Sequence, residues 1–104
     1  MLESIKQMLG MGPKVDLGEV MARGGVIVDV RTTGEYAAGH LKGSINIPLS
    51  ELGNQIYKLN KSKPVITCCA SGMRSSSAKS MLQSSGFSEV HNGGSWMNLK
   101  NLEK

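Results

Sequence analysis

Two adjacent cysteines near the middle of the chain are the residues best suited to nucleophilic chemistry. Cys68 and Cys69 end a β-branched run and precede a short loop that contains Gly72, Arg74 and Ser75. Successive backbone N–H groups of such a loop can point inward and bind an anion, and a helix that starts near Ser75 adds the positive end of its dipole. With the cationic Arg74, these groups favour a thiolate, which is a strong nucleophile.

Only one of the two cysteines can face the loop, because neighbouring side chains of a strand point to opposite faces. From Cys69 the spacing is Cys-x4-Arg-Ser, a small ring that suits a sulfur atom. From Cys68 it is Cys-x5-Arg-Ser, the spacing of cysteine-dependent phosphatases. A phosphatase also needs a general acid, and the only aspartates are Asp16, expected to cap a helix, and Asp29, in an expected strand. These observations favour Cys69 and leave a phosphatase that uses Cys68 as the alternative.

Expected strands and helices alternate around this loop. Strands are expected over residues 26–30, 44–48, 64–68 and 88–91. Helices are expected from the Asp16 and Thr32 capping boxes, from Ser50 to about Leu59, over 75–85 with Gly86 as the residue after the cap, and around Trp96. This order predicts a parallel sheet with helices on both faces. Ligands of such sheets bind beyond the carboxyl ends of the strands, which is where the Cys69 loop lies.

Length and composition indicate a single domain over residues 1–104, with an amphipathic helix and lead-in over 1–14. The net charge of +4 comes from dispersed lysines, which argues against a nucleic-acid partner and suits small anions. The chain has no run of about 20 apolar residues, so no membrane segment is expected. Adjacent cysteines cannot link distant segments, which fits the reducing cytoplasm. The two histidines and two cysteines lack zinc-ligand spacing, so we expect no metal.

Three polar residues outside the loop are interpreted as structural, and Met73 of the loop as a residue at the edge of the pocket. We expect Arg31 to pair with Glu35, and Asp29 to accept hydrogen bonds from nearby backbone groups. His40 is expected to be a hydrogen-bonded structural residue, and Met73 to border the binding pocket.

Three blocks of sequence resemble the rhodanese-like domains, particularly the single-domain bacterial sulfurtransferases. The blocks are 29–31 with 35–36, 39–41, 43 and 46–48; then 69–75 with Gly86-Phe87; then Gly93-Gly94 with Trp96. The resemblance implies a three-layer α/β/α fold with a mainly parallel central sheet. It also implies that the catalytic residue is Cys69, and that the substrate-binding loop comprises Ala70, Ser71, Gly72, Met73, Arg74 and Ser75.

The same resemblance implies a chemistry that needs no cofactor. Cys69 would take a sulfane sulfur from a small sulfur-containing anion such as thiosulfate and pass it to a thiol, a protein sulfur acceptor or cyanide. Met73 stands where the family often has a charged residue, which predicts a weaker preference for an anionic donor. A rhodanese-shaped sulfur-carrier or binding module without turnover is a further alternative.

Overall fold

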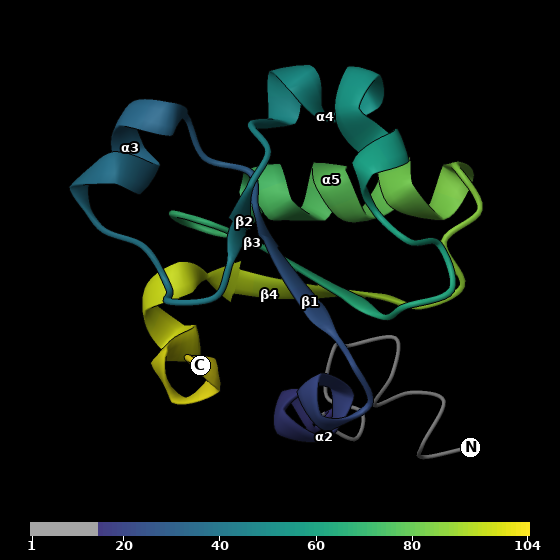
Figure 1. Cartoon of the computed structure of the whole chain (residues 1–104). Helices are drawn as coiled ribbons and strands as arrows, with labels where there is room; N and C mark the ends of the chain where they lie inside the picture. Colours follow the sequence, from purple (N-terminus) through teal and green to yellow (C-terminus); the bar gives the residue numbers. More distant parts are fainter. Residues whose placement is uncertain (1–14) are drawn as a thin grey trace, which may run out of the picture.

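A four-stranded parallel sheet forms the centre of the molecule. The computed structural model describes residues 15–104, and the helix expected over 1–14 lies outside the described residues. The strands are β1 (Val26–Asp29), β2 (Ile45–Asn46), β3 (Val65–Cys69) and β4 (Val90–Ser95), in the order β2-β1-β3-β4 (Figure 1). Every neighbouring pair is parallel, so the predicted mixed α/β fold with a parallel sheet is confirmed.

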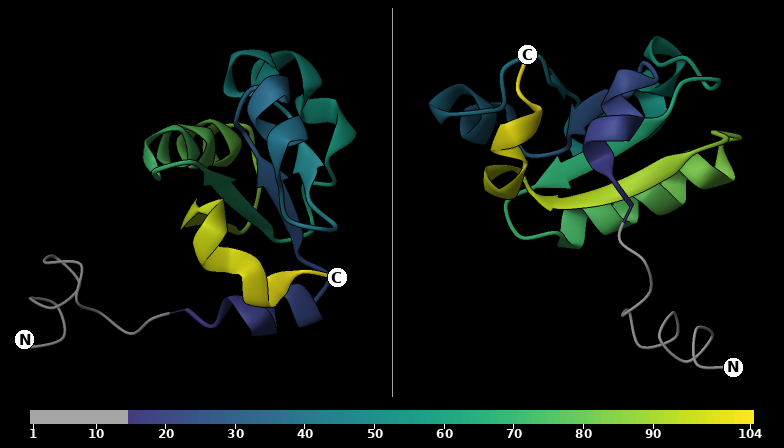
Figure 2. Two further views of the ribbon diagram at one scale, coloured as in Figure 1. Left: turned by 90° about the vertical axis from the view of Figure 1, so that its left-hand side faces the viewer. Right: turned by 90° about the horizontal axis from the view of Figure 1, so that it is seen from below.

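Helices cover both faces of this sheet. They are α2 (Leu17–Ala22), α3 (Thr33–Ala38), α4 (Leu49–Gln55) with the short 3₁₀ helix η1 (Ile56–Lys58), α5 (Met73–Ser84) and the 3₁₀ segment η2 (Trp96–Leu102). In Figures 1 and 2, α4 and α5 lie on one face, and α2 and η2 lie on the other. Among residues 15–104, none of the helices is long and apolar enough to span a membrane.

The two faces of the sheet bury two separate apolar clusters. The first, under α4 and α5, contains Leu52, Ala78 and Leu82, whereas the second contains Val20 from α2 and Leu99 from η2. Side chains of β3 alternate between them: Val65 and Cys69 belong to the first cluster, and Ile66 and Cys68 to the second. The prediction that the two cysteines face opposite sides is therefore confirmed.

Helix caps agree with the sequence at two positions and differ at others. Thr32 and Glu35 form the complete capping box, and Gly86 follows α5 with φ of +95°. At α2 only half of the expected box forms, because Asp16 accepts from the Glu19 N–H while the Glu19 carboxylate pairs with Arg23 instead.

Three element boundaries also differ from the prediction. Ser50 is not a cap, since Pro48 precedes a helix that starts at Leu49 and changes to 3₁₀ geometry at Ile56. The α5 helix starts at Met73, two positions before the predicted Ser75. Strand β4 covers 90–95 rather than 88–91, because the two glycines after Asn92 extend the strand through a bulge instead of ending it.

Candidate functional site

The sulfur of Cys69 lies at the carboxyl end of β3, inside a ring of hydrogen-bond donors. The Gly72 N–H donates to Sγ over 2.9 Å, and the Ser75 N–H over 3.4 Å. The Ser75 Oγ lies 3.5 Å from the same sulfur. Because both amides belong to the start of α5, the sulfur also lies at the positive end of that twelve-residue helix.

The two thiols have opposite tendencies to ionise. Burial opposes ionisation of Cys69, but hydrogen bonds from the Ser75 side chain and from the Ser75, Gly72 and Ser71 amides outweigh it, so the pKa of Cys69 is lowered. Burial in the opposite cluster raises the pKa of Cys68 to about 12, with a further contribution from the Asp29 charge. A phosphatase that uses Cys68 would thus lack an ionised nucleophile, which argues against that alternative.

Only part of the predicted loop is irregular backbone. Ala70, Ser71 and Gly72 connect β3 to α5, whereas Met73, Arg74 and Ser75 form the first turn of the helix. Gly72 has φ of +105°, in the range that favours glycine. This turn brings the chain round so that the amides of residues 72 and 75 both reach the sulfur.

The cation of Arg74 is held by an anion from another helix. Its two terminal nitrogens donate to the two carboxylate oxygens of Glu35 in α3, over 2.7 and 3.0 Å. These bonds, together with those from Thr32, lower the pKa of Glu35 to about 2. Because Arg74 shares its charge with Glu35 and does not hydrogen-bond Sγ, the Gly72 and Ser75 amides are the direct donors to the sulfur, and the Ser75 hydroxyl oxygen accepts from the thiol.

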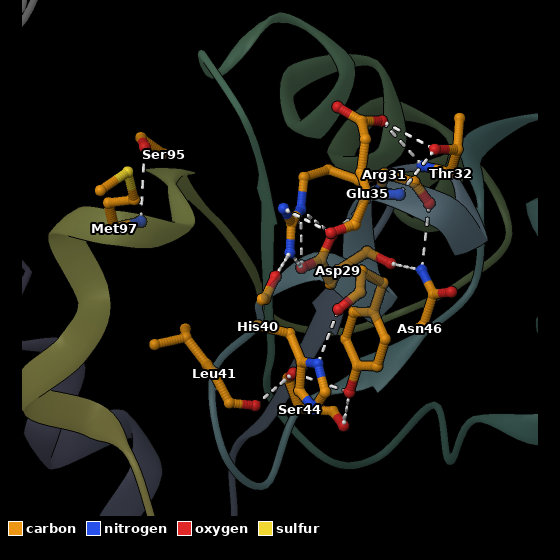
Figure 3. Close-up of polar contacts among 12 residues, drawn as sticks. Asp29, Arg31, Thr32, Glu35, His40, Leu41, Ser44, Asn46, Ser95 and Met97 are labelled. Carbon is orange, nitrogen blue, oxygen red and sulfur yellow. Dashed lines mark hydrogen bonds and ion pairs between the residues drawn. The ribbon is translucent and has the colours of Figure 1, made fainter.

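Arg31 forms a different ion pair from the predicted one. Its guanidinium bonds the carboxylate of Asp29, with Nη2–Oδ2 at 2.8 Å, and the Gly39 carbonyl at 2.7 Å (Figure 3). The prediction that it pairs with the Glu35 side chain is wrong, because Asp29 is fully buried and has greater need of a cationic partner. The expectation that Asp29 also accepts from the backbone is correct, since the Arg31 N–H donates to Oδ1 over 3.0 Å. Trp96 stacks on the guanidinium at 4.6 Å.

His40 has the structural environment that the sequence predicts. Its Nδ1 lies 2.7 Å from the carbonyl oxygen of Tyr36, and the two rings stack at 3.8 Å between centroids. Within residues 15–104, no group of three or more His, Cys, Asp or Glu side chains could hold a metal ion.

A cavity of about 330 Å³ lies beside the loop. Its lining residues are Val30, Thr32, Pro48, Leu49, Ser50 and Arg74. Its lining includes neither Cys69 nor Met73, and Met73 is 79% exposed at the start of α5. Cys69 is 0% exposed, so its sulfur is buried beneath the loop.

Two residues at the site were not singled out from the sequence. The Thr67 hydroxyl donates to the Ser75 carbonyl over 2.8 Å. The Asn92 side chain lies 2.6 Å from the Ser75 hydroxyl. The position of Asn92, directly before a pair of glycines at the end of a strand, is the one signal that could have identified it.

Comparison with known proteins agrees with this geometry. Residues 13–101 match the family model "Rhodanese-like domain". The chain is 38% identical over 69 residues to the thiosulfate sulfurtransferase GlpE of Pseudomonas fluorescens, covering 66% of this chain and 63% of that protein. It is 35% identical over 91 residues to the putative sulfur carrier protein YrkF of Bacillus subtilis, covering 88% of this chain and 44% of that protein.

A solved structure of a rhodanese has the same fold as this chain. The rhodanese with anions from E. coli superimposes with a TM-score of 0.67 at 33% identity, over 71% of this chain and 89% of that one. The chain spans about half the length of the curated relatives it matches. Since the family model covers most of the chain and the fold agrees, this protein belongs to the rhodanese-like domain family.

Proposed function

We propose that this protein is a sulfurtransferase that carries a sulfane sulfur as a persulfide on Cys69. The observation that carries the proposal is the ring of amide donors around Sγ at the start of α5. A site that stabilises a thiolate also stabilises the terminal anion of a persulfide. The substrate-binding groups would be the predicted loop, Ala70 to Ser75.

The reaction we propose has two steps. The Cys69 thiolate attacks the outer sulfur of a donor such as thiosulfate, the S–S bond of the donor breaks, and sulfite leaves with the bonding electron pair. An acceptor thiolate or cyanide then attacks the outer sulfur of the persulfide, and the Cys69 thiolate leaves. Each step exchanges one bond to sulfur for another, so the cycle closes without an external oxidant, reductant or cofactor.

Two amides and one hydroxyl supply the stabilisation that both steps need. The Gly72 and Ser75 N–H groups donate to Sγ whenever Cys69 is a thiolate. That state occurs before the attack on thiosulfate and again after the acceptor has removed the outer sulfur. Fixed donors of this kind need no reorganisation during the reaction. Ala70 and Ser71 are the exposed residues between β3 and α5, so we propose that they contact the outer sulfur of the persulfide.

Intact-mass spectrometry after incubation with thiosulfate tests this proposal. We expect the wild type and Cys68→Ala to gain the mass of one sulfur atom, and Cys69→Ser to gain none. Thiosulfate:cyanide activity should fall by at least about a hundredfold in Cys69→Ser, since no other ionised thiol lies at the site. Sulfur loading that survives Cys69→Ser and disappears in Cys68→Ala would overturn the assignment.

A carrier without efficient turnover is the second candidate. It is supported by the similarity to a protein described as a putative sulfur carrier and by the complete burial of Sγ. Such a carrier would gain sulfur on Cys69 in the same mass experiment, yet release thiocyanate slowly with cyanide and transfer sulfur faster to a protein thiol. The ratio of these two rates separates the two candidates.

A further inference from the structure

A bulge in β4 points the Asn92 side chain at the start of α5. Thr67 of β3 pairs with Asn92, but the pairing resumes only at Cys69 and Ser95, so β4 has one extra residue there. Gly94 adopts φ of +75° within this bulge, and its N–H donates to Asn92 Oδ1 over 2.9 Å. At Gly93 a side chain would lie 2.8 Å from Leu99 and 2.9 Å from Ile66, so the bulge keeps its glycines for steric reasons.

The contacts of the Asn92 side-chain amide identify its oxygen and its nitrogen. The Gly94 N–H can only donate, so the atom that it contacts is the oxygen. The remaining nitrogen lies 3.4 Å from the Gly72 carbonyl oxygen, which can only accept. Both contacts fit one orientation of the amide. The atom 2.6 Å from the Ser75 hydroxyl is therefore an acceptor, and the hydroxyl must be the donor.

The Ser75 hydroxyl has one hydrogen and three possible acceptors. Asn92 Oδ1 lies at 2.6 Å, the Gly72 carbonyl at 3.0 Å and the Cys69 sulfur at 3.5 Å. Because the contact with Asn92 is much the shortest, the hydrogen points there. The lone pairs of the hydroxyl oxygen are then free to accept the S–H of a neutral Cys69 thiol.

We propose that Asn92 is a positioning residue that keeps the Ser75 hydroxyl hydrogen away from Cys69, so that ionisation of the thiol requires this hydroxyl to turn from Asn92 to the sulfur. The thiol proton leaves to water, the bond from Ser75 to Asn92 breaks, and a bond from Ser75 to the thiolate forms. This inference deepens the proposed function and rests on Cys69 as the sulfur carrier. Asn92 would set how much thiolate is available for attack.

Other charged or titratable groups near Cys69 are unchanged by substitution at position 92. They are Cys68 on β3, Arg74 on α5 with its partner Glu35 on α3, and the pair that Asp29 at the end of β1 forms with Arg31 two residues later. His91, next to Asn92 on β4, pairs with Glu89. Asn92 itself is exposed, so its truncation removes little packing.

The pH dependence of Cys69 alkylation by iodoacetamide, located by peptide mass spectrometry, tests the proposal without requiring sulfur transfer. The midpoint of the profile reports ionisation of the thiol, and the plateau reports access to it. We expect Asn92→Ala to lower the midpoint, giving about two- to tenfold more thiolate at pH values below it, the range expected for one hydrogen bond. Asn92→Asp, whose carboxylate binds the hydroxyl more strongly, should raise it.

A Ser75→Ala background distinguishes two explanations of a shifted midpoint. Asn92 either positions the Ser75 hydroxyl or only keeps the loop around Cys69 in place. In that background, Asn92→Ala should no longer move the midpoint, because there is no hydroxyl to redirect. Asn98→Ala, at an exposed asparagine of η2, serves as the matched control and should leave the midpoint unchanged. The proposal is overturned if Asn92→Ala leaves the midpoint unchanged or raises it, or if its effect persists without the Ser75 hydroxyl. Failure of sulfur loading with the expected midpoint shifts would overturn the proposed function alone.

Discussion

At the scale of single residues, the site depends on a balance between burial and hydrogen bonding at one sulfur atom. Cys68 and Cys69 are both fully buried, yet burial raises the pKa of the first and is outweighed at the second. The difference lies in the donors, because the Gly72 and Ser75 amides point at Cys69. Neighbours in sequence thus acquire different chemistry because only one of them faces the start of a helix.

Substitution of Gly72 tests how far this balance depends on one backbone conformation. With φ of +105° and an added Cβ 3.6 Å from Gly94 Cα, Gly72→Ala has space but an unfavourable conformation. We expect it to cost roughly 1–2 kcal/mol of stability. If the backbone relaxes, the Gly72 N–H leaves the sulfur and the pKa of Cys69 rises, which the alkylation profile would detect.

Urea denaturation measures the stability change of this variant. Gly34→Ala is the matched control, because Gly34 lies in α3 with an ordinary φ and nothing within 4 Å of its Cβ position. That variant should be neutral or slightly stabilising, since alanine has a higher helix propensity than glycine. Equal effects of the two substitutions would contradict the argument from conformation.

At the scale of elements, a buried ion pair joins β1 to the segments beyond its carboxyl end. Asp29 ends β1, and Arg31 reaches from it to the Gly39 carbonyl after α3 and to the Trp96 ring at the start of η2. The side chains of the pair are 0% and 5% exposed. Breaking a buried pair by removing one partner leaves an uncompensated charge. The pair therefore holds three elements around one end of the sheet.

Asp29→Ala should accordingly destabilise the protein by about 3–5 kcal/mol. Urea denaturation followed by circular dichroism measures the loss. The double variant Asp29→Ala, Arg31→Met should recover much of it, because no buried charge is then left alone. Arg23→Met, which removes a surface cation paired with Glu19 and Glu89, should have a much smaller effect. A loss below about 1 kcal/mol for Asp29→Ala would show that the pair contributes little.

At the scale of the whole molecule, the two apolar clusters share one sheet, so they should unfold together. Alternate residues of β1 and β3 belong to different clusters, and neither face can lose its strands without exposing the other. Domains of this size usually unfold in one cooperative step. Trp96 is the single tryptophan of the chain, and its fluorescence reports on η2 while far-ultraviolet circular dichroism reports on all helices.

Acid should reveal this cooperativity. Glu35, hydrogen-bonded by Arg74, and Glu89, hydrogen-bonded by Arg23, both have a pKa lowered to about 2 from the ordinary 4.5. A carboxyl with a lowered folded-state pKa stabilises the fold above about pH 4.5, and this contribution is lost as the pH falls toward 2. The urea midpoint should therefore fall over this range, with fluorescence and circular dichroism agreeing at each pH.

Variants at the two glutamates complete this test. Glu35→Gln and Glu89→Gln should each make the acid dependence shallower, because the substituted group no longer binds a proton on unfolding. Both carboxylates are partly exposed, so high salt should also weaken their contributions. Separate fluorescence and dichroism transitions would show that the clusters unfold independently.

What the sequence determined by itself was the local pattern. The β-branched runs, the Thr32 capping box and the Gly86 stop predicted the parallel α/β fold, because these signals act over a few residues. The opposite orientation of the two cysteines followed from strand geometry alone. The family resemblance implied the loop from Cys69 to Ser75 as the site, and in the structure the Gly72 and Ser75 amides of that loop donate to the Cys69 sulfur.

What only the tertiary structure decided was the partner of each polar group. Glu35 binds Arg74 across 39 residues of sequence, and Arg31 binds Asp29 instead, because burial of Asp29 makes an unpaired charge there too costly. Asn92 reaches Ser75 only because a bulge in β4 aligns it with the start of α5. Spacing along the chain does not encode such pairings, which depend on which elements the fold brings into contact.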